Sequence, residues 1–271
     1  MMRVTPEQVA EWQQAVGREQ VMEQVLDAAA LSRFAQAIGL DNENQDPPLP
    51  HWAHFLPSPL DSEIGADGHP RRGDFLPDVS LPRRMFAAAS MEFASPLKIG
   101  VIARQTSRVA ELSHKMGRSG NLVFAKVEKV IEQDGELKVR ELQTYVYRDE
   151  GDRVEMPVPA DSQPDGELWK PDEVNLFRFS AATANSHRIH YDYPYTTEIE
   201  GYPALIVHGP FTAAKLGGLA TRDEPLATFS FRAMAPLFLG QPIFLRRISE
   251  GNFEAVRCDG VTAMTAEATY P

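Results

Sequence analysis

Apolar and polar residues along the chain follow two periodicities, one typical of helices and the other typical of strands. Helical spacing of apolar positions predicts helices over 31–42 and 175–185, and a further apolar helix is expected within 202–220. Alternation of apolar and polar positions, which is typical of strands with one buried face, follows each helical region. The strand segments expected from this alternation are 89–115, 120–135, 136–148, 226–251 and 252–271.

Segments rich in proline, glycine and charge separate these elements. Residues 43–84 contain the sequences NENQDPPLP and LDSEIGADGHPRRGDFLP, which cannot form regular elements. A loop of this length inside a folded domain usually covers something, so we expect it to cover a site. Residues 149–172 are interpreted as a linker, and Asp134-Gly135 is a hairpin turn signal between two strands.

Two pairs of segments suggest that the chain contains a duplicated unit. LSRFAQA (31–37) resembles LFRFSAA (176–182), and SMEFASPLKIG (90–100) resembles SFRAMAPLFLG (230–240). Each match is weak alone, but the two occur in the same order and together favour a repeated helix-then-sheet unit. We therefore divide the chain into a first half (1–148), the linker (149–172) and a second half (173–271).

Composition and charge narrow the possible functions. The chain has 271 residues and a net charge of -11, which argues against non-specific binding to nucleic acid but permits an anionic small ligand at a local basic cluster. Cys258 is the only cysteine, so a disulfide within the chain is impossible. The N-terminal segment lacks an apolar signal core, and the longest apolar runs fall far short of the ~20 residues of a membrane span. These features predict a soluble, cytoplasmic protein.

The segment ANSHRIHYD (184–192) concentrates polar groups that can handle protons. A histidine titrates near neutral pH and can both accept and donate a proton, which makes His190 the candidate base. Asn185 cannot act as a base, but its amide can orient water or a substrate carbonyl. For His187, two roles stay open: it could support the catalytic residues, or it could lie on the surface. The HxxH spacing of His187 and His190 could bind a metal, but no third ligand is evident, so no metal site is predicted.

The segment IVHGPF (206–211) predicts a helix start that faces a ligand. Pro210 suits the first position of a helix, with Gly209 as the N-cap, and the apolar sequence that follows should be buried. Free N–H groups at this terminus would stabilise negative charge on a carbonyl oxygen. Glycine at this position leaves room for a ligand to approach the backbone, and His208 is expected to brace the turn.

The first half has no equivalent of these groups. When the helix match is extended, Asn185 aligns with Leu40 and His190 aligns with Gln45. A turn stabiliser would be needed in both halves, so this asymmetry favours a catalytic role in the second half alone.

The spacing of these motifs resembles the hydratase signature of the MaoC-like hot-dog family. ANSHRIHYD followed by GYPALIVHGPF is similar to the family pattern D-x-N-P-[IL]-H with a later V-H-G, and His208 follows His190 by 18 residues. One branch of this family is most similar to the chain, namely the itaconyl-CoA and mesaconyl-CoA hydratases and the type 2 hydroxyacyl-thioester dehydratases. The similarity rests on the sequences NSHRIHYD, DGHPRRGDFLP (67–77) and LPRRMFA (81–87). The resemblance implies an α+β double hot-dog fold, with two helices each wrapped by antiparallel strands. Asn185 stands where the family usually has aspartate.

The resemblance also implies an activity: reversible addition of water to the double bond of an enoyl-CoA, without a cofactor. His190 would take a proton from water that Asn185 positions, while the thioester carbonyl lies on the Gly209 N–H. The acyl group expected is short, branched and dicarboxylic. The substrate-binding candidates are Arg83, Arg84, Arg178, His187 and His208, and the arginines also suit solvent exposure or an ion pair.

Three other functions stay open. One is a 3-hydroxyacyl-thioester dehydratase of fatty-acid synthesis. The second is a hot-dog thioesterase, which usually needs a carboxylate where Asn185 stands. The third is a non-catalytic acyl-CoA binding module. Because exposed sheet edges tend to pair, we expect a homodimer.

Overall fold

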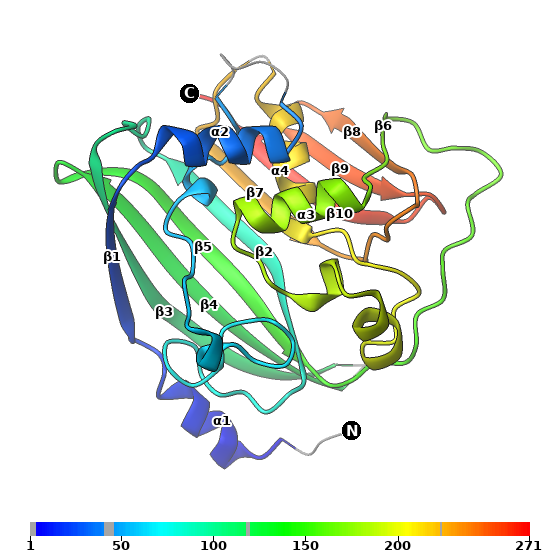
Figure 1. Ribbon diagram of the computed structural model, residues 1–271, viewed down its shortest axis with the longest axis horizontal. Helices are drawn as coiled ribbons and strands as arrows, with labels where there is room; N and C mark the ends of the chain where they lie inside the picture. Colours follow the sequence, from blue (N-terminus) through cyan, green and yellow to red (C-terminus); the bar gives the residue numbers. More distant parts are fainter. Residues whose placement is uncertain (1–3, 41–45, 118–119, 223) are drawn as a thin grey trace.

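The computed structural model describes residues 4–40, 46–117, 120–222 and 224–271. Its framework is one antiparallel sheet of ten strands, in the order β1-β3-β4-β5-β2-β7-β10-β9-β8-β6 (Figure 1). The strands are β1 (Glu19–Val25), β2 (Arg83–Phe93), β3 (Ile102–Gly117), β4 (Gly120–Gln133), β5 (Glu136–Arg148), β6 (Glu167–Trp169), β7 (Thr228–Ala233), β8 (Ile243–Ser249), β9 (Asn252–Arg257) and β10 (Thr262–Thr269).

The order of the strands is the same from each edge of the sheet toward its centre. From one edge it runs β1-β3-β4-β5-β2, and from the other it runs β6-β8-β9-β10-β7. The two series meet where β2 pairs with β7, and Ser90 lies directly opposite Ser230 at this junction. These two serines are equivalent positions of the sequence match between 90–100 and 230–240. The sheet therefore has an internal two-fold arrangement about its centre.

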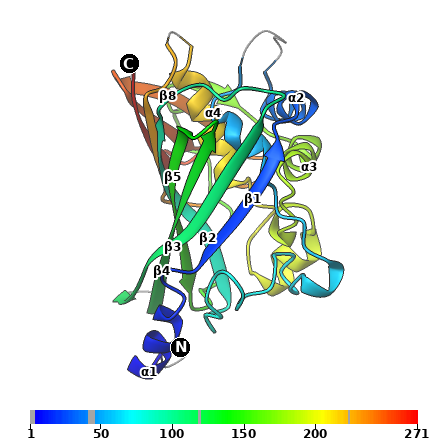
Figure 2. The same ribbon diagram turned by 90° about the vertical axis from the view of Figure 1, so that its left-hand side faces the viewer.

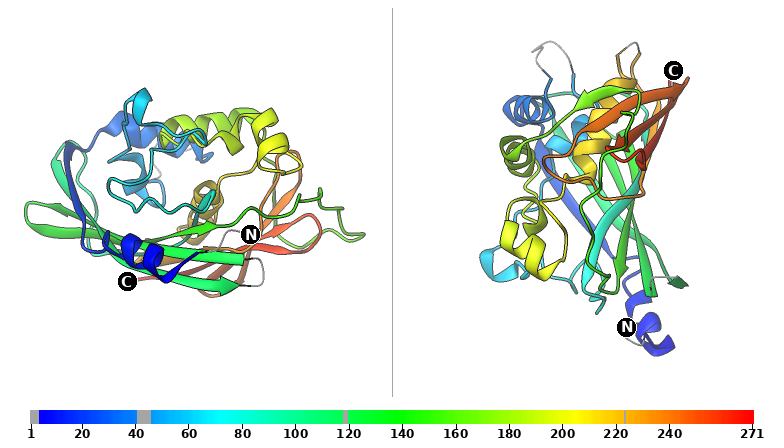
Figure 3. Two further views of the ribbon diagram at one scale, coloured as in Figure 1. Left: turned by 90° about the horizontal axis from the view of Figure 1, so that it is seen from below. Right: turned by 90° about the vertical axis from the view of Figure 1, so that its right-hand side faces the viewer.

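The helices are α1 (Pro6–Gln13), α2 (Ala28–Ala37), α3 (Glu173–Ala182) and α4 (Gly209–Ala220), together with the short turns η1 (Pro50–Ala53), η2 (Asp61–Glu63), η3 (Arg188–His190) and η4 (Tyr195–Ile199). Helices α2, α3 and α4 lie on one face of this sheet, whereas α1 lies at the lower end of the strands (Figure 1). Figure 2 shows α2 and α3 stacked on one side of the sheet, and Figure 3 shows the sheet curving around the elements above its concave face. None of the described helices is long and apolar enough to cross a membrane.

Aromatic packing joins the helices to one another over the second half of the sheet. The ring of Phe179 in α3 stacks on Phe211 in α4 at 4.7 Å and contacts Phe34 in α2 at 6.3 Å. All three side chains are fully or almost fully buried. Since aromatic side chains bury large apolar areas, this cluster fixes the position of α4 against strands β7 to β10.

The helix and strand limits differ from the sequence predictions by a few residues. The predicted helix over 31–42 begins earlier, at Ala28, because Asp27 caps it, and it ends at Ala37. The predicted helix over 175–185 begins at Glu173, where Asp172 and Asn175 form a capping box, and ends at Ala182. The segment 149–172 is more than a linker, because its last residues form the edge strand β6.

The predicted hairpin turn at Asp134-Gly135 is confirmed. It joins β4 to β5, and both residues have positive φ angles, 53° and 77°. Two consecutive residues in this conformation form the turn type that matches the twist of paired strands.

The two halves differ in what lies on the inner face of the sheet. In the second half the twelve-residue helix α4 packs there. In the first half, the described residues between α2 and β2 form only the short turns η1 and η2. The inner face of β2 to β5 is therefore left to loops and, as shown below, to a cavity.

Candidate active site

A cavity of about 500 Å³ lies between the inner face of the first half of the sheet and the start of α4. The segment 43–84 forms part of its wall through His51, Trp52, Asp67 and His69. Asn185, His187, His190 and Gly209 line the same cavity. The structure thus brings the candidate groups of the second half together with residues of the long loop.

His190 is held in one orientation by the backbone. It ends η3, and its Nδ1 atom lies 2.8 Å from the carbonyl oxygen of Ile206. Because a carbonyl only accepts, Nδ1 carries the proton and Nε2 keeps its lone pair. Burial lowers the pKa of His190 to about 3, although the bond to Ile206 opposes this shift. His190 is therefore a neutral imidazole with Nε2 available as a proton acceptor.

His208 supports the ring of His190. The two rings are stacked with centroids 3.6 Å apart, and the Nε2 atom of His208 lies 2.8 Å from the hydroxyl oxygen of Ser180. Burial is the largest cause of the lowered pKa of His208, so it too is neutral. It is fully buried and is not among the described residues that line the cavity. This placement fits the expected bracing role better than a direct contact with substrate.

Asn185 sits in a tight turn that follows α3. Ala184 before it has a positive φ of 48°, and the Asn185 N–H donates to the carbonyl oxygen of Ser180 at 2.9 Å. Its side-chain Oδ1 accepts the backbone N–H of His187 at 3.1 Å. With Oδ1 engaged by the backbone, the Nδ2 amino group is the polar end of Asn185 that can act on a ligand.

The start of α4 points into the cavity. The N-cap is His208 and Gly209 is the first helical residue, so the prediction that Gly209 is the N-cap was wrong by one position; proline therefore occupies the second helical position. A Cβ at Gly209 would meet its nearest protein atoms at 3.7 and 4.0 Å, which is ordinary contact. The fold itself therefore does not require glycine here, which favours a ligand as the reason. The first N–H groups of α4 have no partner within the helix and can bind a developing oxyanion.

A group that the sequence analysis did not single out lies beside His187. Asp67, His69 and His187 have potential metal-ligating atoms that all lie within 4.8 Å of one another. The rings of His69 and His187 are 4.0 Å apart, and His187 contacts His190 edge-on at 5.5 Å. The DGHPRRGDFLP motif containing Asp67 and His69 supported the family resemblance, but local spacing could not show that it reaches the histidine motif.

Removal of metal is expected to leave the activity unchanged. Arg84 lies close enough to Asp67, His69 and His187 to lower the pKa of each, and this positive charge disfavours a divalent cation among them. The rate measured after dialysis against excess EDTA should equal the untreated rate. Loss of activity that returns on addition of a metal ion would contradict this expectation.

The three candidate arginines lie in different surroundings. Arg83 lines the cavity, where its Nε lies 3.2 Å from the carboxylate of Glu200 and its guanidinium lies over the ring of Tyr202. Arg84 also lines the cavity, and donates to the carbonyl oxygen of Pro70 at 3.4 Å. Arg178 is exposed on α3 and is not among the described residues that line the cavity. The structure thus supports cavity contact for Arg83 and Arg84 but not for Arg178.

Polar side chains cross the inner face of the sheet at the other end of the cavity. Ser107 in β3, Lys129 in β4 and Glu141 in β5 are direct cross-strand neighbours, and all lie at inward-facing positions. The Glu141 carboxylate is 1% exposed and lies 3.3 Å from Nε2 of His51. It also accepts from the side chains of Trp52 and Gln143, at 3.1 and 3.0 Å.

The charges in this row influence one another. Burial alone would raise the pKa of Glu141, but the bond to His51 and the charges of His51 and Lys129 hold it below its usual value. Burial lowers the pKa of Lys129, and Glu141 opposes that shift. Strand alternation predicts apolar residues at these inward positions, so the polar row marks a departure that could have been noticed in the sequence.

The comparisons with known proteins agree with this geometry. The family model for hydroxyacyl-thioester dehydratase type 2 matches residues 49–239, which is more than half of the chain. The chain belongs to this family. The match begins inside the 43–84 segment, includes the whole first-half sheet from β2 onward, and contains Asn185, His190 and Gly209.

Relatives of this dehydratase family extend the match to most of the chain. The mesaconyl-C(4)-CoA hydratase of Chloroflexus aurantiacus is 42% identical over 95% of this chain and 97% of its own length. Among solved structures, HtdX from Mycobacterium tuberculosis has a TM-score of 0.68 at 19% identity, covering 93% of this chain and 99% of its own. A second M. tuberculosis protein, described as a double hot-dog fold, has a TM-score of 0.53 at 11% identity and covers 93% and 95%. The resemblance and the α+β double hot-dog fold are thereby confirmed. The expectation of a wrapped helix in each half was wrong for the first half, where the described residues between α2 and β2 form only η1 and η2.

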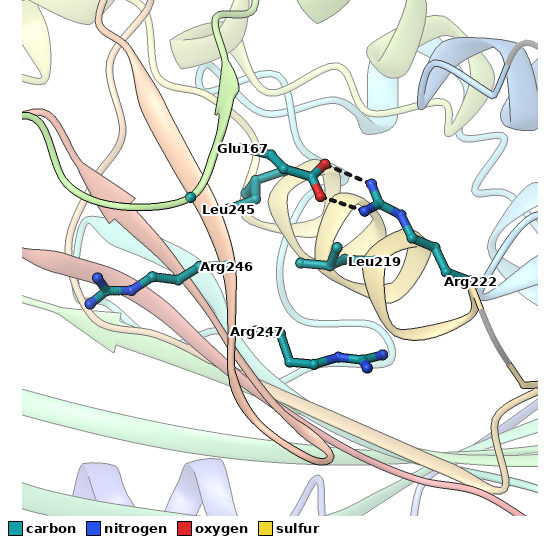
Figure 4. A pocket seen from close by; sticks show the side chains of 7 residues that line it. Glu167, Leu219, Arg222, Leu245, Arg246 and Arg247 are labelled. Atoms are coloured by element: carbon teal, nitrogen blue, oxygen red, sulfur yellow. Dashed lines mark hydrogen bonds and ion pairs between the residues drawn. The ribbon is translucent and has the colours of Figure 1, made fainter.

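A second cavity of about 370 Å³ lies outside the site of this dehydratase-family protein, beside strands β6 and β8 (Figure 4). Arg222, Arg246 and Arg247 line it, but they do not converge. Figure 4 shows Arg222 facing Glu167, with which it forms a bidentate ion pair, and Arg246 pointing to the other side of β8. Arg246 pairs with Glu254, and the guanidinium of Arg247 lies over the ring of Phe253. Because the three arginines do not point to one place and two of them are paired with glutamates, we do not assign an anion site here.

Proposed function

We propose that the protein is a hydratase that adds water reversibly across the double bond of a short, branched dicarboxylic enoyl-CoA, of the mesaconyl-CoA or itaconyl-CoA type. The family membership and the hydratase relative from Chloroflexus aurantiacus support a hydratase or dehydratase reaction. The observation that carries the choice of acyl group is the charged pair Lys129 and Glu141, which are cross-strand neighbours and line the cavity on its sheet side.

The groups near α4 can perform the reaction on the thioester end. The carbonyl oxygen would lie against the N–H of Gly209, where the helix terminus stabilises the negative charge that develops on it. His190 presents Nε2 as a proton acceptor, and Asn185 presents its amide to position the water. Arg83 and Arg84 line the cavity wall, which supports both as candidates for contact with the substrate.

The charged side chains of Lys129 and Glu141 in the cavity support one type of acyl group over another. A long alkyl chain would cover the Lys129 ammonium and the Glu141 carboxylate with apolar surface, and burying charged groups against hydrocarbon is costly. A second carboxylate on the acyl group would instead pair with Lys129. This contrast favours a dicarboxylic substrate over the long-chain intermediate of a fatty-acid synthesis dehydratase, which is the second candidate function.

We further propose that the protein acts as a homodimer in the cytoplasm. The exposed side chains of Val21 and Val25 on the edge strand β1 and of Leu168 on the edge strand β6 support pairing of two copies along a sheet edge.

Parallel assays with mesaconyl-, itaconyl- and crotonyl-CoA test the proposed substrate. Loss or gain of the enoyl-thioester absorbance should be fastest with one of the two dicarboxylic substrates. Fastest turnover of crotonyl-CoA or of a long-chain enoyl-CoA would favour the fatty-acid dehydratase instead. Tight binding of all three without turnover would indicate an acyl-CoA binding module.

Replacing Lys129 with methionine should lower kcat/KM for the dicarboxylic substrate by about 10- to 100-fold, the effect of losing one hydrogen bond between charged groups. Activity on crotonyl-CoA should be unchanged or higher. The matched control is Lys126→Met on the same strand, where the lysine is partly exposed and pairs with Glu111. Equal loss on both substrates would mean that Lys129 supports the fold and not the carboxylate.

A further inference from the structure

Asp67 and His69 reach the active-site cavity from the first half of the chain, although the histidine motif belongs to the second half. We propose that His69 is a second acid–base residue of the hydration reaction, with Asp67 as its positioning residue. The pair would accept the water proton that the Asn185 amide cannot. This inference rests on the proposed function.

Two hydrogen bonds join the Asp67 carboxylate to His69, one to its backbone and one to its ring. The backbone N–H of His69 donates to Asp67 Oδ1 at 3.0 Å, and His69 Nδ1 lies 3.1 Å from Asp67 Oδ2. A carboxylate only accepts, so Nδ1 of His69 carries a proton and Nε2 is left with its lone pair. This is the arrangement in which a carboxylate fixes the tautomer of a histidine base and stabilises its protonated form.

The turn that carries this pair is locked onto the histidine motif. Ser186 Oγ donates to the carbonyl oxygen of Gly68, and the N–H of Arg188 donates to the carbonyl oxygen of Asp67 at 2.9 Å. Gly68 has a φ of +86°, and a Cβ there would collide with the backbone carbonyl of Ser186. The turn at 67–69 can therefore lie this close to Ser186 only with glycine at position 68. This close contact fixes how far Asp67 and His69 lie from the histidine motif.

The imidazole of His69 faces the reacting end of the cavity. Its ring lies 4.0 Å from that of His187, whose backbone N–H holds the Asn185 side chain. Asp67, His69 and Asn185 all line the cavity with His190. His69 is thus joined to Asn185 through His187 and shares the cavity in which Asn185 would hold a water molecule.

The charges around the pair keep it in the form that accepts a proton. Burial would raise the pKa of Asp67, but its bonds to His69 and the charge of Arg84 hold it far below its usual value, so Asp67 is ionised. Burial lowers the pKa of His69, Asp67 opposes this shift, and Arg84 and Arg72 add to it. His69 is therefore neutral before the reaction, and its protonated form would pair with an anion already in place.

The step balances without another reactant. As the oxygen of water bonds to carbon 3, its O–H bond breaks and the proton passes to Nε2 of His69. The electron pair of the double bond moves toward the thioester, giving an enolate whose oxygen lies on the Gly209 N–H. Carbon 2 then takes a proton from the same imidazolium, and His69 returns to its neutral form. His190 accepts a hydrogen bond from the water and orients it.

Variants of His69 and Asp67 test the proposal with whichever enoyl-CoA the wild-type protein hydrates fastest. His69→Gln should lower kcat by about 10²-fold or more with little change in KM. Asp67→Asn should lower it less, because the base is still present. His114→Gln is the matched control, since His114 lies on β3 and is bonded to Asn121, and its turnover should be normal.

A second substitution separates chemistry from folding. Adding Asn185→Asp to His69→Gln places a carboxylate, which can accept a proton, next to the lost base, and should restore kcat at least tenfold over His69→Gln alone. A structural role for His69 would not be rescued in this way. Unchanged turnover in His69→Gln, or a loss that the carboxylate does not restore, would overturn the proposal. A wild-type activity that depends on bound metal would overturn it in favour of a metal site.

A measurement without substrate keeps this test independent of the proposed function. Nitrogen NMR of the free protein should show His69 neutral with its proton on Nδ1, and Asp67→Asn should change that tautomer. If the wild type hydrates none of the enoyl-CoAs, the proposed function fails, and the base role falls with it even when the NMR result is as expected. If the wild type is active and His69→Gln is equally active, only the present inference fails.

Discussion

Replacing His190 with alanine is expected to lower kcat by about 10²- to 10⁴-fold, the usual contribution of general acid–base catalysis. KM should change little, because the proton acceptor and the water it orients matter in the transition state more than in binding. The Nδ1 bond to Ile206 fixes Nε2 of His190 as the atom that accepts a hydrogen bond from the water, and alanine removes that acceptor. Initial rates on the best enoyl-CoA give both constants.

Two controls show whether this loss is chemical. The melting temperature of His190→Ala must stay close to that of the wild type, since removing a buried ring that stacks on His208 can also destabilise the site. The neutral form of His190 is the one that accepts the hydrogen bond of the water, and it persists above the pKa of about 3, so any acid limb due to His190 itself is expected near that pH. Full turnover in His190→Ala, or loss explained by unfolding, would remove His190 from the mechanism.

Local sequence signals were sufficient to select Asn185, His190 and Gly209, which line one cavity, as a candidate site. Asn185, His190 and Gly209 lie within one helix end, one short turn and one helix start, so their spacing along the chain largely determines their positions in space. Pro210 predicted the start of α4 to within one residue, since the N-cap in the structure is His208. Positions that depend on short-range geometry of this kind can be predicted without knowing how the sheet is arranged.

The contribution of the first half could not be read from the chain. Asp67 and His69 meet the histidine motif through contacts that span more than 110 positions, such as Ser186 with Gly68. Their segment has no periodicity, and its path depends on Gly68 fitting against a carbonyl of the other half. The sequence could say only that a long loop covers a site.

Leu40 and Gln45 are the first-half residues that align with Asn185 and His190. Leu40 packs against the hydrophobic core, in line with a non-catalytic position, whereas Gln45 lies outside the described residues. The absence of catalytic side chains at these positions does not make the first half passive. In the first half, the described residues between α2 and β2 form only the short turns η1 and η2, whereas the second half has the helix α4. The inner face of the first-half strands is therefore open to a cavity, which Lys129 and Glu141 line. Because no helix like α4 fills this face in the described residues, the first half has space for the acyl end of a substrate, which the second half lacks.

Substitutions at Asn185 separate two roles of one amide. Asn185→Ala is expected to lower kcat by about 10²- to 10³-fold, comparable with removal of one preorganised hydrogen-bond donor, because both the turn bond to the His187 N–H and the positioning group are lost. Asn185→Asp is expected to keep turnover within about tenfold of the wild type, since a carboxylate still accepts the His187 N–H and its second oxygen can accept the water proton.

The measurements are kcat and KM for both variants at a pH where the new carboxylate is ionised, with melting temperatures as controls for folding. Activity of the aspartate variant well above that of the alanine variant means that water needs an acceptor or an orienting oxygen at this position. Equal loss in both variants means that the Nδ2 amino group must donate, because an ionised carboxylate cannot. In that case the amide of Asn185 would hold the oxygen of water while its proton leaves toward a histidine, and a carboxylate at 185 would not replace it.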